Sequence, residues 1–286
     1  YNRGVEYLRR REFDKAIIDF TKAIELKPDF AVAYAGRGYA YCQKGEIDKA
    51  IKDCNKATEL DPKLAEAYNA RGGVYSAKGE VEKALKDYDK SIELNPSFAE
   101  AYYNRGNVYL LSKNEFDEAI INYDKAIGLN FKSAELYNNR GAAYFKKNKL
   151  DKAILDFNKA IEVNPNFVGA YLNLTLIHSQ KGELDKMVEK CNKIIELDPK
   201  CANAYLLRGD AYTRKGKINL AMLDFDKAIE LAPKYARAML GLAEVYRIKG
   251  DREKAKYWYG QALRNKGLLA IDEQKRAESQ LRNLTQ

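Results

Sequence analysis

The apolar and small residues of this chain recur at three- and four-residue intervals in short blocks, and a glycine or a proline follows most of the blocks. In residues 31–64 there are two such stripes, Tyr34, Gly38 and Tyr41 in the first and Ala50, Cys54 and Ala57 in the second. Gly45 separates the two stripes, and Pro62 follows the second one. Because glycine favours a helix end and proline cannot continue a helix, the pattern predicts a helix, a tight turn and a second helix.

This two-helix unit repeats along the chain. All six prolines lie 34 residues apart, or a multiple of 34 plus one, at Pro28, Pro62, Pro96, Pro165, Pro199 and Pro233. The period predicts units at residues 31–64, 65–98, 99–133, 134–167, 168–201, 202–235 and 236–269, and residues 1–30 read as the same unit without its first four places. A fixed period of this length predicts an array in which each unit packs only against its neighbours.

The order of aromatic and small residues within a unit resembles the tetratricopeptide repeat, as in Tyr68, Gly72, Tyr75, Ala84, Tyr88 and Pro96. The resemblance covers residues 1–269. It implies an all-α, right-handed superhelical solenoid of about eight helix–turn–helix repeats, with the first helices lining the concave face. Residues 270–286 do not fit the unit. Their apolar stripe predicts a C-terminal capping helix.

Two units depart from the pattern. The fourth has an extra residue in its turn region, Ser112–Phe116, and Phe131 in place of the proline, which predicts a local shift of that helix pair. In the sixth, Thr175, His178 and Met187 replace the usual glycine, tyrosine and alanine. His178 is the only histidine, and its place in the tyrosine stripe indicates a packed structural residue.

The seventh place of most units is arginine, and an aspartate follows sixteen residues later in five of them. These predicted pairs are Arg3–Asp19, Arg37–Asp53, Arg71–Asp87, Arg140–Asp156 and Arg208–Asp224. The two units that lack the arginine, at Leu174 and Leu242, also lack the acid. This matched loss predicts an ion pair that joins the two helices of each unit. An arginine ladder for phosphate is the alternative, and the neighbouring acids disfavour it.

The sixth place predicts a peptide-binding surface. Asn104, Asn139 and Asn173 occupy it in three consecutive units, and Tyr103, Asn107, Asn138, Leu172 and Leu176 surround them. An asparagine side chain both donates and accepts hydrogen bonds, so it can hold the backbone of an extended peptide. The row resembles the asparagine ladder of O-linked sugar transferases, although other units interrupt it. The alternative is that these asparagines only keep an exposed face solvated.

Composition and charge exclude several kinds of chemistry. The net charge is +9, but 50 basic and 41 acidic residues alternate along the chain, which is typical of solvated helices and does not favour nucleic acid. Four cysteines without a CxxC, and a single histidine, make no zinc site. We expect reduced thiols, with a Cys42–Cys54 bridge left open. No apolar run reaches the length of a membrane span.

The sequence therefore predicts a non-catalytic protein-interaction scaffold without a cofactor, which binds an extended peptide or partner segment in its concave groove. The alternative is a regulatory or substrate-recruiting arm of a larger multi-domain enzyme or complex. The chain begins inside a repeat, so we expect a truncated N-terminus and an apolar face on that terminal repeat through which copies could self-associate. A cytoplasmic location agrees with the expected reduced thiols. The fifth place lacks the lysine of the family's carboxylate clamp, so binding of an acidic chain terminus is not expected.

Overall fold

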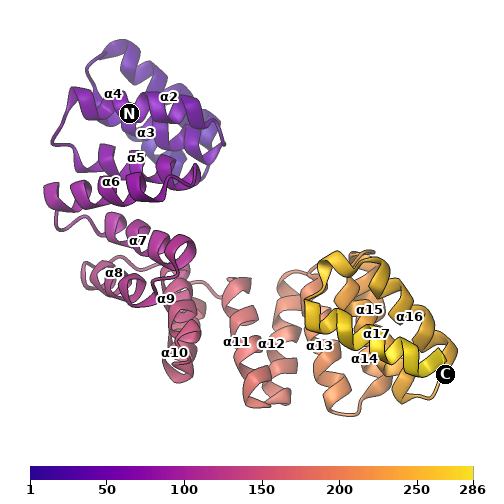
Figure 1. Ribbon diagram of the computed structural model, residues 1–286. Coiled ribbons are helices and arrows are strands. Elements are labelled where there is room, and N and C mark those ends of the chain that lie inside the picture. The colour runs from indigo at the N-terminus through magenta and orange to yellow at the C-terminus, as the bar shows by residue number, and fades with distance from the viewer. Residues whose placement is uncertain (286) are drawn as a thin grey trace. The chain divides into compact units, whose positions relative to one another are not determined.

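The computed structural model describes residues 1–285, and within them every regular element is a helix. The chain forms two compact units, residues 1–153 and residues 154 onward (Figure 1). The first contains α1 (Asn2–Arg9), α2 (Phe13–Leu26), α3 (Ala31–Gln43), α4 (Ile47–Leu60), α5 (Ala65–Ala77), α6 (Val81–Leu94), α7 (Ala99–Val108), η1 (Tyr109–Lys113), α8 (Phe116–Gly128) and α9 (Ala134–Lys146). Helix α10 (Leu150–Val163) includes the division between the units. The second contains α11 (Val168–Lys181), α12 (Leu184–Leu197), α13 (Ala202–Arg214), α14 (Ile218–Leu231), α15 (Ala236–Ile248), α16 (Arg252–Arg264), η2 (Lys266–Leu268) and α17 (Ile271–Thr285).

The helices form the predicted repeated pairs. Within each compact unit, a first helix packs against the second helix of its own repeat and against helices of the next repeat, as α3 does with α4 and α5. Residues that face both partners are small, and Ala50, Ala84 and Ala221 are completely buried. The all-α class and the helix-pair repeat are thereby confirmed.

The turn inside each repeat depends on a left-handed backbone position. Gly45 has φ of 77° between α3 and α4, and Gly79, Gly182, Gly216 and Gly250 have similar values in the corresponding turns. Glycine adopts this conformation without the clash that a Cβ atom causes. Arg11 and Asn148 occupy the same region in turns that lack the glycine.

The turn between repeats combines a short polar side chain with proline. Asp61 follows α4, and its Oδ1 accepts a hydrogen bond from the backbone N–H of Lys63 at 2.9 Å. Asn95 does the same for Ser97 at 3.1 Å. The intervening Pro62 or Pro96 has no N–H to leave unpaired, so the side chain and the proline together end one helix and start the next repeat.

Helix contact within a repeat is closest at the eighth-place glycines. A Cβ atom on Gly38 would lie 2.5 Å from Cys54 Sγ and 3.1 Å from the Ala50 carbonyl oxygen. We expect Gly38→Ala to lower the free energy of unfolding by about 1–3 kcal/mol, because the two helices must move apart. Urea unfolding followed by circular dichroism measures this.

Gly73 provides the control in the neighbouring repeat. A Cβ atom there would meet nothing closer than the Tyr88 hydroxyl, at 3.9 Å. We expect Gly73→Ala to leave stability unchanged or to raise it by up to about 1 kcal/mol, because alanine favours helix. Equal losses in both variants would contradict the close-contact explanation.

The extra residue of the fourth repeat is absorbed in its first helix. After Val108 the α-helical turns widen into the π-helical turn η1, and Asn114 follows with φ of 55°. A π-helical turn accommodates one inserted residue without ending the helix. Phe131, in place of proline, packs its ring against Tyr103 with 5.2 Å between centroids.

Helix α17 caps the last repeat (Figure 1). Its Ala277, Leu281 and Leu284 join the apolar cluster of Ala243 on α15 and Tyr259 on α16. These are surfaces that a further repeat would cover, so the predicted capping helix is confirmed. None of the helices in residues 1–285 has the length and hydrophobicity to cross a bilayer.

Candidate functional site

The first compact unit contains a groove made of two adjoining hollows. One is about 560 Å³ and is lined by α1, α3 and the N-terminal parts of α5 and α7. The other is about 900 Å³ and extends along α3, α5 and α7 to the start of α9. We call the two hollows together the first groove. The residues that line both of them are Leu8, Arg9, Tyr39, Asn69, Ala70 and Glu100. The groove is lined mainly by the second, fifth, sixth and ninth places of the first helices.

Asparagine side chains in and beside this groove bond to one another across repeats. Asn104 Nδ2 donates to Asn69 Oδ1 at 3.0 Å, which joins α7 to α5. Asn139 Nδ2 donates to Asn107 Oδ1 at 3.0 Å, and the hydroxyl of buried Tyr123 donates to the same oxygen at 2.8 Å. These bonds hold the amides in fixed orientations. Asn104 lines the groove, and its carbonyl oxygen accepts no hydrogen bond within the described chain.

The structure distributes the predicted peptide-binding residues over several environments. Tyr103 and Asn104 line the first groove. Asn107, Asn138 and Asn139 belong to the amide network beside it, where Asn138 Nδ2 donates to Asn139 Oδ1 at 3.3 Å. The remaining three, Leu172, Asn173 and Leu176, belong to the second compact unit.

The two leucines among these residues differ in burial. Leu172 packs against the cluster of Met187 and Cys191 and contributes to the core. Leu176 is 44% exposed. The prediction from the sequence also omitted Asn69, which lies at the fifth place of its repeat and accepts the bond from Asn104.

Glu100 is a further groove residue that the prediction omitted. It is half-buried in the wall shared by the two hollows and has no hydrogen bond or ion pair within residues 1–285. Burial raises the pKa of its carboxyl group. A signal was present in the sequence, because Glu66, Glu100 and Glu135 occupy the second place of three consecutive repeats.

The predicted arginine–aspartate pairs lie outside this groove, between helices. Arg71 Nε and Nη2 donate to the two carboxylate oxygens of Asp87 at 2.7 and 2.8 Å. Arg3–Asp19, Arg37–Asp53 and Arg208–Asp224 have the same two-bond geometry. The fifth pair, Arg140 with Asp156, would join residues of the two compact units and stays a prediction.

The arginines after Arg3 also reach the preceding repeat. Arg71 Nη1 donates to Asn55 Oδ1 at 3.2 Å and to Thr58 Oγ1 at 3.0 Å. Its guanidinium lies over the rings of Tyr68 and Tyr75, at 5.3 and 6.0 Å from their centroids. The corresponding acceptors for Arg37, Arg105, Arg140 and Arg208 are Thr21, Asp89, Asp124 and Asn192. These guanidinium groups thus donate to protein partners, which disfavours a phosphate ladder.

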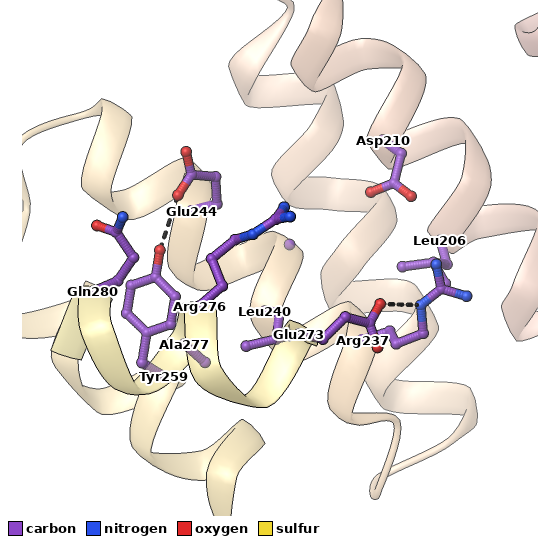
Figure 2. A pocket seen from close by; sticks show the side chains of 11 residues that line it. Leu206, Asp210, Arg237, Leu240, Glu244, Tyr259, Glu273, Arg276, Ala277 and Gln280 are labelled. Carbon is purple, nitrogen blue, oxygen red and sulfur yellow. Dashed lines mark hydrogen bonds and ion pairs between the residues drawn. The ribbon is translucent and has the colours of Figure 1, made fainter. Parts of the chain in front are cut away.

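The second compact unit has a smaller pocket of about 350 Å³ (Figure 2). Its walls come from α13, α15 and α17, with Tyr259 of α16. Arg237 Nε lies 3.1 Å from Glu273 Oε1, and the Tyr259 hydroxyl donates to Glu244 Oε2 at 2.8 Å. The first contact ties the capping helix α17 to α15, and the second ties α16 to α15.

Asp210 enters this pocket from α13 (Figure 2). It has no hydrogen bond within the described chain, and burial raises the pKa of its carboxyl group to about 6, against the opposing effect of Arg237 and Arg214. The pocket therefore has one half-buried carboxylate without a protein donor.

The single histidine and the four cysteines are the remaining side chains that could take part in catalysis or metal binding. His178 is buried, and its Nδ1 lies 2.7 Å from Glu183 Oε2, as a packed structural histidine would. All four cysteines are free thiols, and Cys54 and Cys191 are buried. Residues 1–285 contain no group of three or more histidine, cysteine, aspartate or glutamate side chains that could hold a metal ion.

Family comparisons match repeat after repeat of this chain. Models described as "Tetratricopeptide repeat" match residues 1–30, 20–52, 134–167, 168–201 and 202–235. A model described as "TPR repeat" matches residues 38–79, 72–112 and 110–148. The search of curated proteins finds no match.

Several solved structures have a similar fold. YrrB, described as a TPR protein with an unusual peptide-binding site, is 30% identical over 65% of this chain and 95% of YrrB, with a TM-score of 0.56. The MamA protein is 30% identical over 62% of this chain and 96% of its own, with a TM-score of 0.55. A tetratricopeptide repeat protein from Parabacteroides merdae is 20% identical over 90% of this chain and 99% of its own, with a TM-score of 0.61. At this identity the similarity supports the fold alone.

The helix pairs, their turns and the matches over most of the chain agree with one another. The chain belongs to the tetratricopeptide repeat family and is a protein-interaction scaffold.

Proposed function

We propose that the first groove binds an extended peptide segment of a partner protein, without catalysing a reaction on it. The observation that carries this proposal is the amide network, in which the groove residue Asn104 bonds to Asn69 and keeps a carbonyl oxygen that accepts no hydrogen bond within the described chain. A peptide backbone needs both donors and acceptors at fixed positions, and asparagine amides supply them independently of the peptide sequence.

The walls of the groove supply the other part of such a site. Apolar side chains such as Val5, Leu8 and Phe98 line the smaller hollow. Aromatic rings, including Tyr39 and Tyr103, line the larger one. Hollows of this kind can hold the side chains of a peptide whose backbone is bound by the amides. The similarity to YrrB, which is described as having a peptide-binding site, adds support.

The free thiols support a cytoplasmic setting for this binding. Cys54 and Cys191 are buried, and burial raises the pKa of both thiols. Buried thiols that are kept protonated are suited to a reducing compartment. We therefore extend the proposal to a cytoplasmic partner.

The experiment that tests the proposal begins with random peptides displayed on phage and selected on the whole chain. The peptide that binds best is then synthesised with a fluorescent label and titrated by polarisation. We expect Asn104→Ala with Asn139→Ala to weaken its binding about 5- to 150-fold, because about two hydrogen bonds of about 0.5–1.5 kcal/mol each are lost.

A matched pair of asparagines controls for general effects of the substitutions. Asn219 and Asn283 are exposed on α14 and α17, outside the first groove, and their double alanine variant should bind as the wild type does. Circular dichroism must show equal helicity in all three proteins. If the groove variant binds the selected peptide as tightly as the wild type, the peptide binds elsewhere and the proposal is wrong.

A further inference from the structure

The first groove contains a carboxylate that the protein itself does not neutralise. Glu100, in the first turn of α7, lines both hollows of the groove at the wall where they meet. It is half-buried and forms no hydrogen bond or ion pair within residues 1–285. A half-buried charge without a partner is costly to maintain, and a bound cation would remove that cost.

Aromatic rings surround this carboxylate. Tyr39, Tyr88 and Tyr103 line the larger hollow with Glu100, and Phe131 packs against Tyr103 at 5.2 Å between centroids. Burial raises the pKa of Tyr39 and Tyr103, and the charge of Glu100 adds to the rise in each. The faces of tyrosine rings attract cations, and this attraction grows when water is excluded.

The basic residues of the groove do not satisfy Glu100. Arg9 and Arg11 line the larger hollow, but Arg9 Nη1 pairs with Glu6 at 3.6 Å. Neither guanidinium forms an ion pair with Glu100. The other acids of the same place, Glu66 and Glu135, are exposed and hydrated, so they are expected to contribute less to binding.

We propose that Glu100, together with Tyr39 and Tyr103, binds a lysine or arginine side chain of the partner peptide. The inference rests on the proposed peptide-binding function and names the chemistry of one residue of that peptide. Asn69 also lines both hollows, so the peptide backbone bonded to the amide network passes close to Glu100. The aliphatic stem of the basic side chain then packs on the rings, and its charged end reaches the carboxylate.

A small probe tests this subsite without any knowledge of the partner. N-acetyl-lysine methylamide is titrated into the whole chain, with the corresponding norleucine compound as the uncharged analogue. The ring signals of Tyr39 and Tyr103 are followed by NMR with labelled tyrosine. We expect millimolar binding of the lysine compound at both rings, about tenfold weaker binding to Glu100→Gln, and no saturation by the norleucine compound.

Glu59→Gln is the matched control, because it removes the same charge from the exposed end of α4 in the same compact unit. Its tyrosine signals should respond to the lysine compound as those of the wild type do. If the lysine compound leaves the Tyr39 and Tyr103 signals unchanged, or if Glu100→Gln binds it as well as the wild type does, the inference is overturned.

The selected peptide separates this inference from the proposed function. Suppose that binding is weakened by Asn104→Ala with Asn139→Ala, but that peptides with lysine and with norleucine at each position bind equally well. In that case the groove binds peptides, and Glu100 is not a subsite for a basic residue. If the small probe binds at Tyr39 and Tyr103 but no selected peptide depends on the asparagines, the subsite exists and the peptide-backbone function fails. We expect a lysine-to-norleucine change in the peptide to weaken binding to the wild type about tenfold, and binding to Glu100→Gln hardly at all.

Discussion

Arg71→Leu is expected to lower the free energy of unfolding by about 2–4 kcal/mol, because it leaves a buried aspartate without its partner. The Asp87 side chain is only 7% exposed, and both of its oxygens accept from Arg71. The same substitution also removes the hydrogen bonds to Asn55 and Thr58 of the preceding repeat. Urea unfolding curves measured at pH 7 give the change.

The double variant Arg71→Leu with Asp87→Leu should recover much of this loss. Two apolar side chains in place of a half-buried ion pair are often close to neutral, because no charge remains to be desolvated. We therefore expect the free energy of unfolding of the double variant to lie within about 1–2 kcal/mol of the wild-type value. The loss in the double variant should thus be smaller than the sum of the losses in the two single variants.

Arg3 supplies a control with the same geometry in a different environment. Its two bonds to Asp19 measure 2.7 Å each, but the Arg3 side chain is 75% exposed. We expect Arg3→Leu to lower stability much less than Arg71→Leu does, because solvent screens the exposed guanidinium. Strictly additive losses in the Arg71 and Asp87 variants would show that the two side chains do not stabilise the repeat as a pair.

Asp210→Asn is expected to raise stability at pH 7 by about 1–3 kcal/mol, in the direction opposite to most substitutions. Asp210 lies in the pocket between α13, α15 and α17 and has no hydrogen-bond donor within the described chain (Figure 2). Burial raises the pKa of its carboxyl group to about 6 from the ordinary value of 3.8. Asparagine has nearly the same shape and carries no charge to desolvate.

The pH dependence follows from the direction of this pKa shift. Between about pH 4 and pH 6 the folded protein keeps a proton on Asp210 that the unfolded chain has lost. The contribution of Asp210 to stability is therefore greatest below pH 4, falls as the pH rises towards 6, and remains low above it. The gain from Asp210→Asn should be present at pH 7 and should vanish at about pH 4.

Thermal melts at pH 4, 5, 6 and 7 measure this difference. Glu230→Gln on the exposed face of α14 serves as control, because within residues 1–285 Glu230 pairs only with Lys227, in the preceding turn of the same helix. It should change stability by no more than about 0.5 kcal/mol at any of these pH values. A melting temperature that falls in Asp210→Asn at pH 7 would contradict the unpaired-carboxylate interpretation.

These two predictions separate charges that hold the repeats together from charges that the repeats leave open. Asp87 and Asp224 are buried and each receives two hydrogen bonds from arginine. Glu100 and Asp210 are half-buried at the surfaces of hollows and receive none within the described chain. Charges of the first kind are expected to stabilise the fold, and charges of the second kind are available to a bound cation.

The sequence by itself determined the helix pairs, their period and their turns. The spacing of Pro62 and Pro96, the glycine in most turns and the apolar stripes act within 34 residues, so local stereochemistry and one-sided burial suffice to predict them. It also indicated four arginine–aspartate contacts that the structure describes. The prediction rested on the arginine at the seventh place of most repeats and on the loss of both the arginine and the acid in two repeats.

Only the tertiary structure decided which polar side chains meet across repeats and which remain unpaired. The bonds of Asn104 to Asn69, and of Arg71 to Asn55, join different repeats, and their existence depends on how those repeats stack. Only the structure showed that a π-helical turn accommodates the inserted residue of the fourth repeat. Glu100 is half-buried beside a hollow that rings of α3, α6 and α7 also line, and a local sequence pattern does not report such burial. Burial is a property of neighbours that are distant in the sequence, and this is why only the fold showed that Glu100 is half-buried while Glu66 and Glu135, at the same place of their repeats, are exposed.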